Sequence, residues 1–150
     1  MHIQFESASL EDADILISVQ NQSFHSDFVQ YGVCPGYNRS HDSMVESISL
    51  HHVYKILCDG TVVGDIIVRD KGNETFYLGC ICVIPGYENK GIGQLAMQFV
   101  DACFPAARHW SLETPSDKLK NHYFYKKHGY EVTKEYDVEG VRISFFEKYL

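Results

Sequence analysis

The spacing of apolar residues changes repeatedly along the chain and predicts a mixed α/β domain. Residues 2–6 alternate between apolar and polar positions, which predicts a first strand. Ser9, with Asp12 in the capping-box position, predicts the start of a helix. One face of that helix has an almost continuous apolar stripe, formed by Ala13, Leu16, Ile17 and Phe24 and interrupted by the polar Gln20. Residues 25–38 are interpreted as a loop, and a second helix is predicted over about 40–51.

A β-hairpin follows the second helix. Residues 53–58 and 61–68 are rich in β-branched residues and flank Asp59-Gly60, a pair that favours a two-residue turn with positive φ. The polar residues 70–74 predict a second turn, and a third apolar run covers 75–84. These three strands are expected to form an antiparallel meander.

The period then becomes helical. Ile92, Leu95, Ala96, Phe99, Val100 and Cys103 share one helix face, and Pro105 ends that helix. Further elements are predicted as a strand at 110–114, a helix at 117–128 that ends at Gly129, and strands at 130–136 and 141–146. The predicted order is β-α-α-β-β-β-α-β-α-β-β. Residues 75–114 form a β-α-β unit, so its two strands should be parallel and joined by a right-handed crossover.

The length and composition fit one soluble domain. The 150 residues contain no linker or repeat, so a single domain over 1–150 is expected. Hydrophobic residues make up 45% and charged residues 22%. No apolar run approaches the roughly 20 residues of a membrane helix. Residues 1–6 lack the features of a signal peptide, so a cytoplasmic location is expected.

Charge and cysteine content limit the possible partners. The net charge is 13 − 20 = −7, which disfavours nucleic acid and suits a cationic amine, although solubility explains the acidity equally well. The five cysteines form no CxxC pair, and free buried thiols are expected. Cys80 and Cys82 share one strand face and are expected in the core. The eight histidines form no HExxH motif, so no metal site is predicted.

The segment from Val83 to Gln94 carries the strongest chemical signal. A strand leads into it and an amphipathic helix follows it. The first amides of a helix lack internal acceptors and carry partial positive charge, which makes them an anion site. Gly91 and Gly93 would allow phosphate to approach the backbone, and Lys90 adds a positive charge. Alternatively, both glycines only permit a tight turn. The pattern is neither GxxxxGK[ST] nor GxGxxG.

Two motifs here resemble those of a known family. Pro85-x-Tyr87-x-x-Lys90-Gly91-Ile92-Gly93 resembles motif A of the GNAT superfamily of N-acetyltransferases, (Gln/Arg)-x-x-Gly-x-(Gly/Ala). Glu88 occupies the Gln/Arg position, which is a departure from that motif. Residues 121–130 resemble motif B, whose core is Phe-Tyr-Glu-Lys-x-Gly-Phe. The resemblance implies the α/β (α+β) GNAT fold, a mixed and mostly antiparallel central sheet flanked by helices.

The resemblance implies transfer of an acetyl group from acetyl-CoA directly to a primary amine of a small molecule or peptide, with a homodimer as one possible state. A non-catalytic CoA-binding or CoA-sensing domain on the same fold is an alternative. A generic nucleotide-binding module is a third interpretation. The residues implied to bind CoA are Ile81, Cys82 and Val83 through their backbone, Glu88, Asn89, Lys90, Gly91, Ile92, Gly93 and Gln94 around the phosphates, and Asn121.

The resemblance also assigns catalytic candidates. Tyr125 is implied to be the general acid, because a phenol can protonate a leaving thiolate. Glu113 is a candidate general base, although a helix-capping or salt-bridged carboxylate explains it equally well. His109 and Asp65 are weaker options. The acceptor site is expected at the first two helices and their loop, around His25, Phe28 and Tyr31 with Asp27 and Tyr37, unless these residues form a packed loop or a dimer contact.

Overall fold

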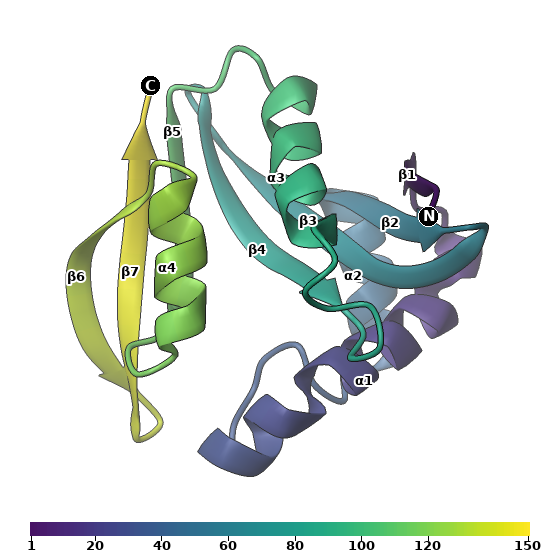
Figure 1. The fold of residues 1–150 in the computed structure, drawn as a ribbon, viewed down its shortest axis with the longest axis horizontal. Helices are drawn as coiled ribbons and strands as arrows, with labels where there is room; N and C mark the ends of the chain where they lie inside the picture. Colours follow the sequence, from purple (N-terminus) through teal and green to yellow (C-terminus); the bar gives the residue numbers. More distant parts are fainter. The chain divides into compact units, whose positions relative to one another are not determined.

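The computed structural model describes all residues from 1 to 150, and its elements confirm the predicted order (Figure 1). The elements are β1 (Ile3–Ser7), the short 3₁₀ helix η1 (Leu10–Asp12), α1 (Ala13–Tyr31), α2 (His41–Leu50), β2 (His52–Cys58), β3 (Thr61–Gly72), β4 (Thr75–Val83), α3 (Ile92–Cys103), β5 (His109–Pro115), α4 (Leu119–Lys127), β6 (Glu131–Val138) and β7 (Val141–Tyr149). None of these helices combines the length and the apolar character that a membrane span requires.

The chain divides into two compact units. Unit 1 comprises Met1–Val68 and Cys80–Phe104, and unit 2 comprises Arg69–Gly79 and Pro105–Leu150. Strands β3 and β4 each contribute residues to both units. Each unit is described separately below.

The strands form a seven-stranded sheet in the order β1-β2-β3-β4-β5-β7-β6. The pairs β1–β2, β2–β3, β5–β7 and β6–β7 are antiparallel. Strands β4 and β5 are parallel, and their pairing covers Thr75–Tyr77 against His109–Ser111. The expected mixed, mostly antiparallel sheet is therefore confirmed.

In unit 1 helices cover both faces of the strands. Ala13 and Leu16 of α1 and Met44 of α2 form a buried cluster with Val53 of β2 and Ile67 of β3. On α3, the ring of Phe99 stacks on Phe5 at 4.5 Å and meets Tyr54 edge-on at 5.0 Å. Because neighbouring side chains of a strand point to opposite faces, Val53 and Tyr54 place α3 on the face opposite to α1 and α2.

In unit 2 helix α4 packs against β7. His122 and Tyr125 of α4 contact the ring of Phe146, with centroid distances of 4.9 and 5.8 Å. Phe146 is fully buried, as are Trp110 and Leu112 of β5. Phe145 therefore lies on the other face of the strand.

Two boundary predictions were wrong. Residues 25–31 are not loop, because α1 continues to Tyr31 and ends where Gly32 adopts φ +76° and donates its N–H to the carbonyl of Phe28. The predicted turn at 70–74 is shorter, because β3 extends to Gly72. Only Asn73 and Glu74, with φ of 54° and 60°, lie between β3 and β4.

The hairpin turn was predicted correctly. Asp59 and Gly60 join β2 to β3 with φ of 50° and 83°, as a two-residue turn of the primed type requires. Glu139 and Gly140 repeat this arrangement between β6 and β7, with φ of 50° and 82°. The short turns fix the registers of both hairpins.

Candidate functional site

The turn from β4 into α3 leaves backbone amides without helical partners. Gly91 is the N-cap of α3 with φ +82°, and Asn89 also has a positive φ of 59°. The amide of Leu95 donates to the carbonyl of Gly91 at 3.2 Å. The amides of Ile92, Gly93 and Gln94 precede that bond and have no acceptor within the helix. Ile92 is 1% exposed and anchors this first turn in the core.

The outer surface of this turn is open. Glu88, Asn89, Lys90 and Gly91 are exposed, and a Cβ placed on Gly91 would meet no atom within 4 Å. The first turn of α3 contains no acidic residue. The positive end of the helix dipole is therefore available to an anion. Glu88, the residue that departs from the family motif, is exposed.

The end of β4 is held by its neighbour β3. A Cβ on Gly64 would lie 2.1 Å from the carbonyl oxygen of Cys82, so the two strands approach closely only because residue 64 is glycine. Ile84 donates its amide to the carbonyl of Val63 at 2.8 Å. The side chain of Cys82 is buried, whereas those of Ile81 and Val83 are half-buried. Residues 81–83 lie beyond Tyr77, the last β4 residue paired with β5.

Helix α4 carries two of the predicted residues. Tyr125 is half-buried, and its ring also contacts Tyr130 at 6.0 Å. Asn121 lies one turn earlier on the same helix and donates from Nδ2 to Oγ1 of Thr114 at 3.0 Å, which ties α4 to β5. After the helix, Gly129 adopts φ +93°, as its predicted C′ position requires.

Glu113 on β5 accepts hydrogen bonds from two tyrosines. Tyr77 donates to Oε1 at 2.7 Å and Tyr136 donates to Oε2 at 2.5 Å. Burial and the bound carboxylate raise the pKa of both phenols far above the usual value. Both hydroxyls therefore stay protonated near neutral pH and hold the exposed carboxylate between three strands. Arg69 adds a positive charge 5.7 Å from the centre of the Tyr77 ring.

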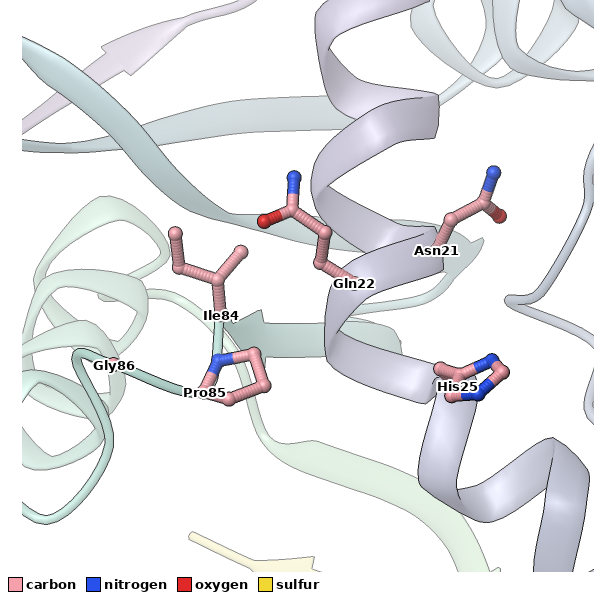
Figure 2. Close-up of a pocket in the computed structure, with 6 residues that line it drawn as sticks. All are labelled: Asn21, Gln22, His25, Ile84, Pro85 and Gly86. Carbon is pink, nitrogen blue, oxygen red and sulfur yellow. The ribbon is translucent and has the colours of Figure 1, made fainter.

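Within unit 1, α1 and the segment after β4 line an open surface pocket of about 580 Å³ (Figure 2). Its lining residues are Asn21, Gln22 and His25 of α1 with Ile84, Pro85 and Gly86. In Figure 2 the side chain of Gln22 extends from α1 toward Ile84. The pocket thus includes the start of the segment that leads from β4 into α3.

Two of the three predicted acceptor residues lie together at the end of α1. The hydroxyl of Tyr37 and Nδ1 of His25 are 3.2 Å apart, and Phe28 stacks on Tyr37 with ring centroids at 4.7 Å. Tyr31 is the last residue of α1 and is half-buried. Of these residues, only His25 lines the pocket.

The other proposed bases are less suitable. Asp65 is 0% exposed and accepts a hydrogen bond from Gln20 at 2.8 Å, so an amine in solvent has no access to it. His109 is half-buried, with Nε2 3.6 Å from Oε1 of Glu147.

Sequence reasoning missed Tyr77 and Tyr136 at Glu113, and it missed the pocket residues Asn21 and Gln22 of α1. The two tyrosines lie on β4 and β6 and are 59 positions apart in the chain (136 − 77 = 59). No local sequence pattern indicates that both contact Glu113. On α1, helical spacing brings together the polar residues Asn21, Gln22 and His25. This polar group could be recognised in the sequence only if the helix were known to continue past residue 24.

Comparison with known proteins gives one family. The family model described as "Acetyltransferase (GNAT) domain" matches residues 49–132, which is more than half of the chain. The uncharacterized protein YrkN of Bacillus subtilis is 33% identical over 87 residues, which are 57% of this chain and 47% of that protein. The alignment thus spans about half the length of this curated relative.

Solved structures share the fold at low identity. The PaiA N-acetyltransferase of Thermoplasma acidophilum, in complex with coenzyme A, superposes with a TM-score of 0.84 at 19% identity and covers 100% of both chains. The ribosomal-protein-S18-alanine N-acetyltransferase of Escherichia coli gives 0.81 at 11% identity, over 99% of this chain and 94% of that one. These structures share the fold, and the family model matches more than half of the sequence, so the chain belongs to the GNAT acetyltransferase family.

Proposed function

We propose that this protein is an acetyl-CoA-dependent N-acetyltransferase that acts on a primary amine of a small molecule or peptide. The observation that carries the proposal is the turn before α3, where positive-φ Gly91 leaves three backbone amides open to an anion. The solved relative in complex with coenzyme A supports the choice of cofactor. The five free cysteines and the absence of a membrane-spanning helix support a cytoplasmic enzyme.

The residues present fit CoA in two places. The amides of Ile92, Gly93 and Gln94, with the mobile charge of Lys90 and the backbone of 88–91, suit the pyrophosphate. The backbone of residues 81–83 lies beyond the β4–β5 pairing, and this supports an assignment of its amides and carbonyls to pantetheine. Asn121 keeps its Oδ1 for the same ligand while Nδ2 holds Thr114.

Proton transfers accompany the acyl transfer. The acceptor must lose a proton to attack the thioester carbonyl, and we assign Glu113 as the acceptor of that proton, directly or through water. The C–N bond would form as the C–S bond breaks, and the attacking nitrogen would then release its remaining extra proton to water. The hydroxyl of Tyr125 would donate a proton to the leaving thiolate and regain one from solvent. We assign binding of the amine substrate to three residues near the end of α1, His25, Phe28 and Tyr31.

Calorimetry with CoA tests the cofactor assignment. CoA should bind and raise the unfolding free energy by about 2.7 kcal/mol at a hundredfold excess over Kd, whereas adenosine, which lacks the pyrophosphate, should do far less. Absence of CoA binding at millimolar concentration would defeat the proposal. Tight CoA binding without turnover on any amine would instead identify a CoA-sensing domain on the same fold.

A further inference from the structure

A group of sulfur and oxygen atoms from the side chains of β3 and β4 lies in unit 1, and one of its members, Cys82, belongs to the strand segment whose backbone is proposed to bind pantetheine. Asp65 of β3 and the two cysteines Cys80 and Cys82 of β4 place one ligand atom each within 4.8 Å of one another. Asp65 is 0% and Cys82 6% exposed, whereas Cys80 is half-buried and lies on the more accessible side. Proposed acetyl transfer uses none of these three side chains.

The cysteine thiols donate hydrogen bonds to Asp65 at distances slightly shorter than those between the ligands of a tetrahedral metal site. Oδ1 of Asp65 lies 3.1 Å from Sγ of Cys82 and 3.4 Å from Sγ of Cys80. A tetrahedral Zn²⁺ with metal–sulfur bonds of about 2.3 Å and metal–oxygen bonds of about 2.0–2.2 Å needs neighbouring ligand atoms roughly 3.5–3.8 Å apart. A shift of a few tenths of an ångström therefore opens room for the ion.

Gln20 supplies a fourth polar group with an unmet acceptor. Its Nε2 lies 2.8 Å from Oδ2 of Asp65 and 3.6 Å from Sγ of Cys80, while its Oε1 is buried without a hydrogen-bond partner. Gln20 is 1% exposed. Rotation of the amide by half a turn would direct Oε1 at the group, an orientation that is favourable only when a cation lies between the amide oxygen and the carboxylate.

The charges balance for a divalent ion. Two thiolates and one carboxylate carry three negative charges, which a buried site cannot hold without partners. A divalent cation leaves one negative charge, and the positive charge of Arg39 acts on Asp65. Arg39 itself is fixed by hydrogen bonds to Ser43 and Ser47 of α2. A divalent ion therefore offsets two of the three negative charges that the buried group would otherwise hold.

We propose that Asp65, Cys80 and Cys82, with the amide of Gln20, form a structural binding site for one thiophilic divalent cation of the Zn²⁺ class. Thiolate ligands select Zn²⁺ over Mg²⁺ or Ca²⁺. Binding displaces the two thiol protons to solvent and leaves the oxidation states of metal and sulfur unchanged. The ion links α1, β3 and β4 at the core of unit 1.

Local sequence patterns gave no sign of this site. Cys80 and Cys82 do not form a CxxC pair. Because they are two positions apart in a strand, their side chains point to the same face of the sheet, and this pattern predicts only that the face is part of the core. Folding brings Gln20, 45 positions before Asp65, and the two cysteines to one point. The prediction of no metal site rested on motifs alone.

The experiment is a zinc and cobalt titration of the purified full-length chain. The protein is first reduced, stripped of metals and then mixed with an excess of Zn²⁺. After dialysis it should retain about one Zn²⁺ per chain. During the titration it should release two thiol protons for each ion bound. Co²⁺ should give an absorption spectrum with thiolate-to-metal charge-transfer bands. Cys80→Ser should lower the Zn²⁺ affinity by roughly 100-fold or more, since even loss of an outer partner of a ligand costs 10- to 100-fold.

Cys58→Ser is the matched control. Cys58 is another buried β-strand thiol beside a carboxylate, with Sγ 3.8 Å from Oδ2 of Asp59, and lies outside the group. It should leave metal affinity and the Co²⁺ spectrum unchanged. The proposal is overturned if the wild-type chain retains no Zn²⁺, if Co²⁺ shows no thiolate bands, or if Cys80→Ser and wild type bind equally. The wild-type proton release and Co²⁺ spectrum decide the matter even if a variant fails to fold.

Discussion

At the scale of single residues, Tyr125 and Glu113 carry the proposed chemistry. The ring of Tyr125 packs between Phe146 and Tyr130, which fixes its direction, and Glu113 is fixed by two phenol donors. Groups held by their neighbours in this way transfer protons with little reorganisation. Each assignment can therefore be tested by a substitution that preserves the shape of the side chain and removes its proposed proton transfer.

Tyr125→Phe should turn over acetyl-CoA more slowly by about 10²–10⁴-fold, or ~3–5 kcal/mol of barrier, because it keeps the ring and removes the proton donor. The loss should appear in kcat and kcat/KM together, with acetyl-CoA affinity unchanged. Tyr123→Phe is the matched control, since Tyr123 lies on the same helix and is 74% exposed. Steady-state kinetics and melting temperature on the same preparations separate the two roles. A lower melting temperature with unchanged kcat would show that Tyr125 is purely structural.

Glu113→Gln should lower kcat, because the amide keeps the shape of the side chain and removes the proposed proton acceptor. Tyr136→Phe should lower kcat by less, because it removes one of the two phenol donors that hold the carboxylate and leaves Tyr77 in place. Steady-state kinetics and melting temperature on the same preparations measure both effects. If neither variant changes kcat, Glu113 is not the base.

At the scale of elements, the glycine turn before α3 is where sequence and structure agree best. Periodicity predicted that a helix begins at Ile92, and the positive φ of Gly91 gives the reason for the glycine. The extent of α1 was not predictable in the same way. Its residues 25–31 carry aromatic and polar side chains without an apolar stripe, so only the C-cap at Gly32 marks its end.

Gly91→Ala should weaken CoA binding as well as stability. An alanine at φ +82° costs about 1–2 kcal/mol, and its Cβ enters the open space at the helix end where phosphate is proposed to bind. Gly60→Ala is the matched control, because Gly60 has φ +83° and likewise no atom within 4 Å of the added Cβ. Both variants should lose similar stability in denaturant titrations, and only Gly91→Ala should lose CoA affinity. Equal CoA affinity in the two variants would show that the phosphates of CoA do not bind at this turn.

At the scale of the whole molecule, the order of elements and the family motifs were predictable because both depend on residues that are close together in the sequence. Hydrophobic period, turn glycines and capping residues act locally, and the resulting order matches the structure. Contacts between distant segments were not predictable. Tyr77 and Tyr136 at Glu113, and Gln20 at Asp65, meet only after the strands pair, and no spacing rule connects them.

The division into two units has a consequence for binding. Residues 88–94 belong to unit 1, whereas Tyr125 and Glu113 belong to unit 2, so the residues proposed for CoA binding and for catalysis are distributed over both units. CoA should therefore increase protection of amides in both units in hydrogen-exchange measurements, including the start of α3 and α4. Adenosine, which lacks both pyrophosphate and pantetheine, serves as the matched control ligand. Protection confined to unit 1 would mean that the ligand does not reach Tyr125.

Amine-dependent release of the CoA thiol tests the central claim most directly. The purified chain is mixed with acetyl-CoA and a panel of polyamines, aminoglycosides, amino acids and peptides, and the free thiol and the acetylated product are both measured. Thiol release should saturate with acetyl-CoA, match the acetylated product one for one, and be slowed by Tyr125→Phe. Thiol release that is the same with and without amine, or none at all from a chain that binds CoA, would contradict this claim.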